Sequence, residues 1–134
     1  MFNFVAHIKF CGVKDESRLP FTLNYRDGKK IRKTHHYKDD TVNLTFNGPS
    51  QNLHLRSGYG EKYLVFCSIC EDDRELLKDK LHSIGRNGDS DSEMMLELFL
   101  QLGLEGFQCL PSGFTFIFID YKKEKVLAVR DHIG

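Results

Sequence analysis

GFTFIFI, residues 113–119, decides the fold, because a strand this continuously apolar is typical of one buried on both faces. The polar turn Asp120-Tyr-Lys-Lys-Glu124 follows it, and then a second β-like run from Lys125 to Val129. The two runs and the turn between them predict a β-hairpin. We expect its first strand to be a central strand of a sheet.

Two helices are predicted before this hairpin. Residues 71–84 begin with acidic side chains, which complement the helix dipole, and carry an apolar stripe formed by Leu76, Leu77, Leu81 and Ile84. Ser90 and Glu93 have the spacing of a capping box, which predicts a second helix from 91 to 102 that ends at Gly103. Strands, two adjacent helices and a hairpin indicate an α+β fold in two layers.

The first half of the chain contains weaker strand patterns. They cover residues 2–10, the alternating run 41–46, residues 52–56 and residues 62–67. Residues 14–40 are polar and turn-rich, with a hairpin-type signal at Arg26-Asp27-Gly28. No repeat or linker interrupts the pattern, so we expect one domain over residues 1–134.

Composition excludes several classes of function. The 134 residues have a formal net charge of zero, so no global field favours nucleic acid or an anionic membrane as a partner. The basic run from Lys29 to Lys33 is interpreted as a solvated loop, because Asp39 and Asp40 follow closely. The start lacks the basic region and cleavage site of a signal peptide, and no segment has the length of a membrane span. A cytoplasmic protein with free thiols is expected.

Cys67 and Cys70 form a C-x-x-C pair between a predicted strand and a predicted helix. This placement suggests a redox dithiol, and His35 and His36 could complete a zinc site with the same cysteines. Cys67 ends an apolar run, however, and no second metal-binding pair accompanies it. We therefore interpret both cysteines as small hydrophobic residues and expect no metal and no cofactor.

A more specific pattern covers the last 45 residues. Ser90-Asp91-Ser92-Glu93 opens a helix, Gly103 ends it, Leu110, Phe114 and Phe116 lead into the hairpin, Asp120 lies at its turn, and Arg130-Asp131-His132-Ile133-Gly134 follows. This order and spacing resemble, without a gap, the class II glutamine amidotransferase domain of the asparagine synthetase family. Its pattern is S-D-x-E, a glycine, L-x-G-x-F-A-F, an aspartate and R-D-x-x-G.

The resemblance implies a layered sandwich of the N-terminal-nucleophile (Ntn) type, with antiparallel sheets and two adjacent helices. In the family, R-D-x-x-G leads to further strands and then to an ATP-pyrophosphatase domain. The chain lacks that synthetase domain, so we expect an N-terminal piece, namely a truncated product, an isolated domain or a gene remnant. The implied function is a part of asparagine biosynthesis or of a similar ATP-dependent amide-forming system.

The family hydrolyses glutamine with an N-terminal cysteine, whose own α-amine is the general base. In the simplest register Phe2 occupies that position, and Phe66-Cys67 replaces the Asn-Gly pair that stabilises the oxyanion. The resemblance therefore implies a pseudoenzyme with no catalytic residue.

A second register remains open. Phe10-Cys11-Gly12-Val13 imitates the family's M-C-G-I start, and cleavage of a leader would expose Cys11 as the nucleophile of an active glutaminase. Gly48-Pro49 and His54-Leu55-Arg56 then fall near the family's R-G-P-D and H-x-R motifs. Lys14 to Ser17 is too polar for the buried first strand that this register requires.

Two substrate-binding residues follow from the resemblance. Asp91 matches the aspartate that binds the α-amino group of glutamine, and Arg56 matches the arginine that binds its carboxylate. From the residues alone, Asp91 is an acid in the first turn of a helix and Arg56 is an exposed arginine.

Three functions stay open at this point. The chain is an amidotransferase-like domain without glutaminase activity, an active glutaminase that starts at Cys11, or a protein-binding module that kept the fold. The expected partners are glutamine, bound weakly, and a synthetase subunit or a second copy of the chain, with neither nucleic acid nor membrane.

Overall fold

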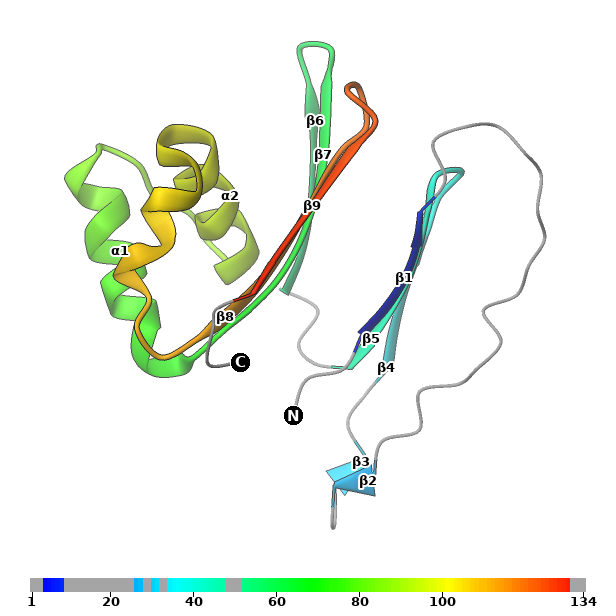
Figure 1. The fold of residues 1–134 in the computed structure, drawn as a ribbon, viewed down its shortest axis with the longest axis horizontal. Coiled ribbons are helices and arrows are strands. Elements are labelled where there is room, and N and C mark those ends of the chain that lie inside the picture. The colour runs from blue at the N-terminus through cyan, green and yellow to red at the C-terminus, as the bar shows by residue number, and fades with distance from the viewer. Residues whose placement is uncertain (1–3, 9–25, 28–29, 32–33, 48–51, 131–134) are drawn as a thin grey trace. The chain divides into compact units, whose positions relative to one another are not determined.

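The computed structural model describes residues 4–8, 26–27, 30–31, 34–47 and 52–130 (Figure 1). The chain divides into two compact units, residues 1–50 and residues 51–134. The sheets of both units are antiparallel, and both α-helices belong to the second unit. The fold class is therefore α+β, as predicted, whereas the single domain stays a prediction.

The second unit contains a four-stranded sheet in the order β6-β7-β8-β9. Strand β8 is the predicted apolar run, and it lies between β7 and β9, so its central position is confirmed. Phe116 of β8 faces Cys67 on one side and Val129 on the other. The strands are β6 (Leu53–Gly58), β7 (Glu61–Ile69), β8 (Phe114–Asp120) and β9 (Lys125–Arg130).

Between β7 and β8 the chain forms the two predicted helices. The Ser90 hydroxyl accepts a hydrogen bond from the Glu93 amide at 3.2 Å, as expected of a cap, and Gly103 ends the second helix with a φ of 67°. The first helix differs from its prediction, because its first residues form a 3-10 turn. The segments are η2 (Glu71–Asp73), α1 (Arg74–Ser83), α2 (Asp91–Leu102) and η3 (Gly103–Cys109).

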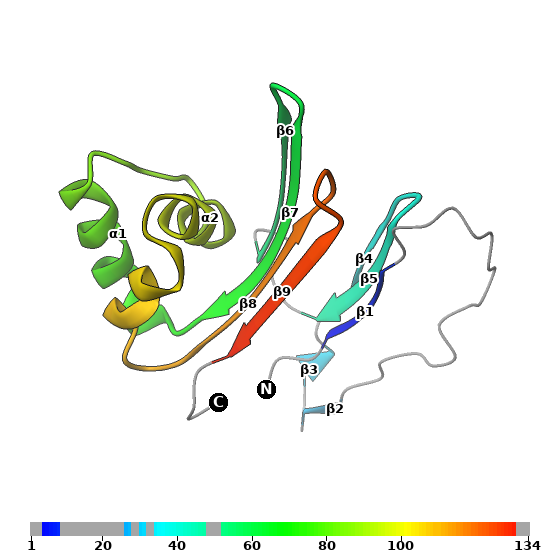
Figure 2. The same ribbon diagram turned by 45° about the horizontal axis from the view of Figure 1, so that its top comes forward.

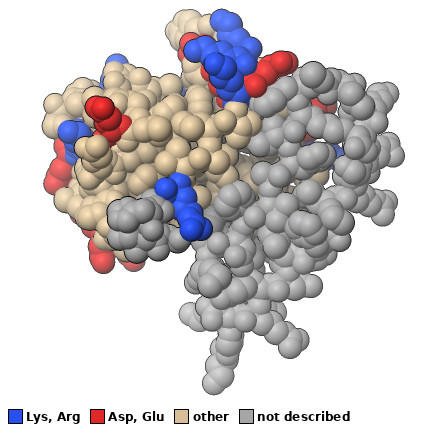
Figure 3. Space-filling view, in the orientation of Figure 1, with Lys and Arg blue, Asp and Glu red and all other residues tan. Residues whose placement is uncertain are grey.

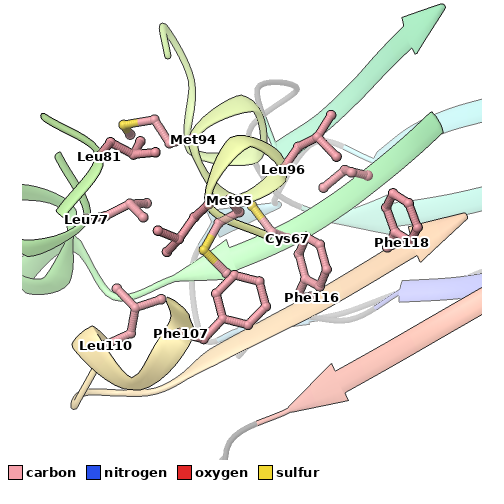
Figure 4. Close-up of a cluster of buried hydrophobic side chains, with 12 residues drawn as sticks. Cys67, Leu77, Leu81, Met94, Met95, Leu96, Phe107, Leu110, Phe116 and Phe118 are labelled. Carbon is pink, nitrogen blue, oxygen red and sulfur yellow. The ribbon is translucent and has the colours of Figure 1, made fainter. Parts of the chain in front are cut away.

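The core lies between these helices and one face of the sheet (Figures 2 and 4). Phe116 is fully buried there, and its ring lies 4.8 Å from that of Phe107 and 5.4 Å from that of Phe99. Only half of the predicted stripe of α1 is buried, because Leu76 is exposed. The buried members of the core are Val65, Cys67, Leu77, Leu81, Met94, Met95, Leu96, Leu98, Phe107, Leu110, Phe116 and Phe118.

The opposite face of the same sheet is apolar too. Leu64 pairs with Ile119 and Phe66 with Ile117, and these four side chains alternate along their strands with those that face the helices. All four are buried. The continuous apolar runs of β7 and β8 are therefore explained by burial on both faces.

The first unit contains a three-stranded sheet in the order β1-β5-β4 and a short β2–β3 ladder. The alternation predicted around residues 41–46 is confirmed, because Val42, Leu44 and Phe46 are buried. The ladder pairs Arg26 with Ile31, as the Asp-Gly signal predicted. The strands are β1 (Phe4–Ile8), β2 (Arg26–Asp27), β3 (Lys30–Ile31), β4 (Thr34–Lys38) and β5 (Val42–Asn47).

Strand β4 is missing from the sequence prediction, which assigned residues 14–40 to turns. Its sequence, T-H-H-Y-K, is polar, and pairing with β5 supplies what its composition lacks. The ring of His35 stacks on that of Phe46 at 5.2 Å, and His36 shares a hydrogen bond of 3.0 Å with Thr45. Such cross-strand pairs stabilise a sheet independently of strand propensity. Among the described residues, no helix combines the length and apolar character needed to cross a membrane.

Replacing Phe116 with alanine should lower the free energy of unfolding by about 3–5 kcal/mol, because the cavity would lie in the centre of the core. Leu104→Ala is the control, since Leu104 is 48% exposed, and it should cost about 0.5 kcal/mol or less. Urea unfolding followed by circular dichroism measures both. Equal losses would contradict the central position of β8.

Candidate functional site

Asp91, the predicted partner of an amino group, is the first residue of α2 and is buried. Its carboxylate accepts two hydrogen bonds from Arg74, at 2.8 Å from Nε and 2.9 Å from Nη2. This is the planar two-point geometry that a guanidinium forms with a carboxylate. The same hydrogen bonds raise the pKa of Arg74, so the pair stays ionised.

Local sequence explains why these two groups meet. Arg74 and Asp91 are the first residues of α1 and α2, so the pair ties the N-terminal ends of the two helices together. An arginine at a helix N-terminus opposes the helix dipole, and the carboxylates of Asp91 and Glu71 offset that charge. The buried carboxylate of Asp73 accepts a hydrogen bond of 2.9 Å from the Ser112 amide, which ties the chain before β8 to the same place.

Arg56, the predicted partner of a carboxylate, lies on β6 and donates a hydrogen bond to Glu97 of α2. The side chain of Glu97 is only 11% exposed, whereas that of Arg56 is 36% exposed. This ion pair therefore joins the edge strand β6 to the helix that covers the sheet.

The structure brings neither predicted residue to the other. Asp91 binds Arg74, and Arg56 binds Glu97, so the charge of each is matched by a side chain of the same chain. An amino acid that used Asp91 and Arg56 would have to displace a guanidinium and a carboxylate. Their role in binding glutamine stays a prediction.

Sequence reasoning missed both of these partners. Arg74 lies 17 positions before Asp91, and no local spacing rule connects residues that far apart. Glu97 had a usable signal, because it is the only charged residue in the run M-M-L-E-L-F-L of α2. An acid within an apolar helix is rarely buried without a cationic partner.

The thiols of the described residues are not arranged for chemistry. Cys67 is fully buried within the core, and burial raises the pKa of its thiol, with a smaller effect from the carboxylate of Asp91. Cys70 and Cys109 are half-buried, and all three thiols are free. The interpretation of Cys67 as a small hydrophobic residue is confirmed. In the described part of the chain, no three His, Cys, Asp or Glu residues gather as metal ligands would.

Several predicted positions lie outside the described residues. They are the Phe2 position of the expected nucleophile, the alternative nucleophile Cys11, the Gly48-Pro49 pair and residues 131–134 of the R-D-x-x-G motif.

No protein-family model, curated protein or solved structure matches this chain. The resemblance to the asparagine synthetase family therefore depends on residues 90–134 of the sequence itself.

Breaking the Arg74–Asp91 pair should destabilise the second unit. Arg74→Met leaves a buried carboxylate without its partner and should cost about 2 kcal/mol in the free energy of unfolding. Asp91→Asn removes the buried charge and should cost less. The double variant should therefore be clearly more stable than the sum of the single losses predicts.

Lys78→Met is the matched control, because Lys78 forms an exposed pair with Glu75 at 2.9 Å on the same helix. That variant should cost about 0.5 kcal/mol or less. Chemical unfolding of all four variants gives the comparison. A loss for Arg74→Met no larger than that for Lys78→Met would show that the pair contributes nothing.

Cys67 should resist alkylation in the native protein. A thiol with a raised pKa and no exposed surface presents almost no thiolate, so iodoacetamide at pH 8 should modify Cys70 at least about a hundredfold faster. Peptide mapping by mass spectrometry resolves the individual cysteines. In urea, Cys67 and Cys70 should react at similar rates, and rapid native labelling of Cys67 would contradict its burial.

Proposed function

We propose that the chain is an asparagine-synthetase-like glutamine amidotransferase domain of type 2 that does not hydrolyse glutamine. Its role is structural or regulatory, within an ATP-dependent amide-forming system. The observation that carries this proposal is the ungapped pattern from Ser90 to Gly134. The described elements support it, because a capped helix, a glycine stop and a hairpin follow in the order that the pattern implies.

We also propose that the fold is a layered sandwich of the Ntn type. The helices cover one face of the four-stranded sheet, and Leu64, Phe66, Ile117 and Ile119 make the other face equally apolar. A sheet with two apolar faces needs a layer on each side, and a sandwich provides both.

The absence of glutaminase activity follows from the chemistry of the family's reaction. That route needs a thiolate, an α-amine on the same residue and fixed donors for the oxyanion. In the simplest register Phe2 supplies no nucleophile, and Phe66-Cys67 stands where the Asn-Gly donors belong. Cys67 cannot replace the nucleophile, since its thiol is buried in the core.

The two internal ion pairs support a domain that does not turn over glutamine. Arg74 occupies Asp91, and Glu97 occupies Arg56, so an amino acid meets no unpaired charge at either residue. Glutamine binding is therefore weak in this proposal. The domain acts through a protein partner, such as a separate synthetase subunit, and without a cofactor.

Incubation with glutamine tests the proposal directly. The full chain should release no ammonia above the uncatalysed background, because attack on the amide has no nucleophile. A chain trimmed to begin at Cys11 is the comparison, since it would carry a cysteine with a free α-amine.

The outcomes separate the two functions. Ammonia from the untrimmed chain, with its own N-terminus verified by mass spectrometry, would refute the proposal. Release only by the trimmed chain, abolished by Cys11→Ala, would establish instead a glutaminase activated by cleavage. No release from either chain is the expected result.

A further inference from the structure

Strand β9 lies at the edge of the four-stranded sheet. Its inner side pairs with β8 along its whole length, from Asp120 opposite Lys125 to Thr115 opposite Arg130. On its outer side, no strand formed by the described residues pairs with it. An open edge presents unpaired N–H and C=O groups, which is the usual template for binding another strand.

The composition of β9 is unusual for an open edge. Four apolar residues, Val126-Leu-Ala-Val129, lie between two exposed cations, Lys125 and Arg130. Val126 is 42% exposed, and the strand contains no acid. Neither cation forms an ion pair with a described residue. Figure 3 likewise shows basic side chains at the upper and lower borders of a largely uncharged surface.

The strand is held firmly in place from behind. Leu127 packs against the core, and the buried carboxylate of Asp120 accepts a hydrogen bond of 2.9 Å from the Lys123 amide at the hairpin turn. The turn is completed by Glu124, which adopts a φ of 52°. A preordered edge loses little conformational entropy when a partner strand is added.

We propose that the outer edge of β9 binds an extended segment of a partner protein by β-strand addition. The segment carries two carboxylates five positions apart, with apolar or β-branched residues between them. The carboxylates face Lys125 and Arg130, and the backbone of the segment pairs with that of Val126 to Val129. This inference goes beyond the amidotransferase proposal and does not depend on it.

Charge favours such a partner over a second copy of the chain. When two β9 strands pair antiparallel in register, Lys125 of each lies opposite Arg130 of the other, because the strand has a cation at both ends. Like charges directly opposite destabilise a strand pair. The same two cations that disfavour self-pairing attract a segment with carboxylates at both ends, so they select the partner.

Peptide binding to the full chain tests the proposal. The probe is a fluorescein-labelled decapeptide with the central sequence Glu-Val-Thr-Ile-Val-Glu, and one control peptide has lysine in place of both glutamates. A second control carries N-methyl groups on alternate residues, which removes the backbone donors of one edge. We expect the glutamate peptide to bind at least about tenfold more tightly than either control.

Matched variants locate the site. Lys125→Glu combined with Arg130→Glu should weaken binding of the glutamate peptide about tenfold and improve binding of the lysine peptide. Lys80→Glu combined with Arg86→Glu makes the same change in charge at exposed positions of α1 and the following turn, and should leave binding unchanged. Amide exchange at Val126 to Val129 should slow when the glutamate peptide binds.

Several results would overturn the proposal. They are no binding of the glutamate peptide, equal binding of the glutamate and lysine peptides, or retained binding of the N-methylated peptide. Concentration-dependent dimerisation in the ultracentrifuge, with protection of β9 and no peptide binding, would assign the edge to a second copy instead.

Discussion

The structure of the second unit depends on one constraint, which is that β8 must be covered on both faces. Phe116 and Phe118 project toward the helices, while Ile117 and Ile119 project to the other side, and all four are buried. Helices α1 and α2 meet this demand on one face. Neighbouring strands satisfy the backbone of β8 on both edges, so its position follows from its apolar side chains and its backbone groups together.

Local signals account for what the sequence predicts well. The run of β8, the Ser90 cap and the Gly103 stop each act within a few residues, so each is visible without the fold. Strand β4 is not, because its polar residues become a strand only through pairing with β5. The same limit applies to the site, since nothing local connects Asp91 to Arg74 across 17 positions.

The two ion pairs of α2 have different physical settings. Arg74 holds the buried Asp91 where two helix ends meet, with two hydrogen bonds in ideal geometry. Arg56 reaches from an edge strand to Glu97, and its own side chain remains partly in solvent. Removing one partner of such a pair leaves a charge with too little water around it, so both pairs hold α2 against its surroundings.

A site that binds an amino acid has to keep an unpaired cation and an unpaired anion in a partly dry setting. Such groups cost stability, because nothing in the empty protein compensates them. Once turnover is no longer required, pairing them with side chains of the same chain removes that cost. Under the proposed function, Arg74 and Glu97 have this effect on Asp91 and Arg56. The residues that the family uses for recognition then persist here because they stabilise the helix layer.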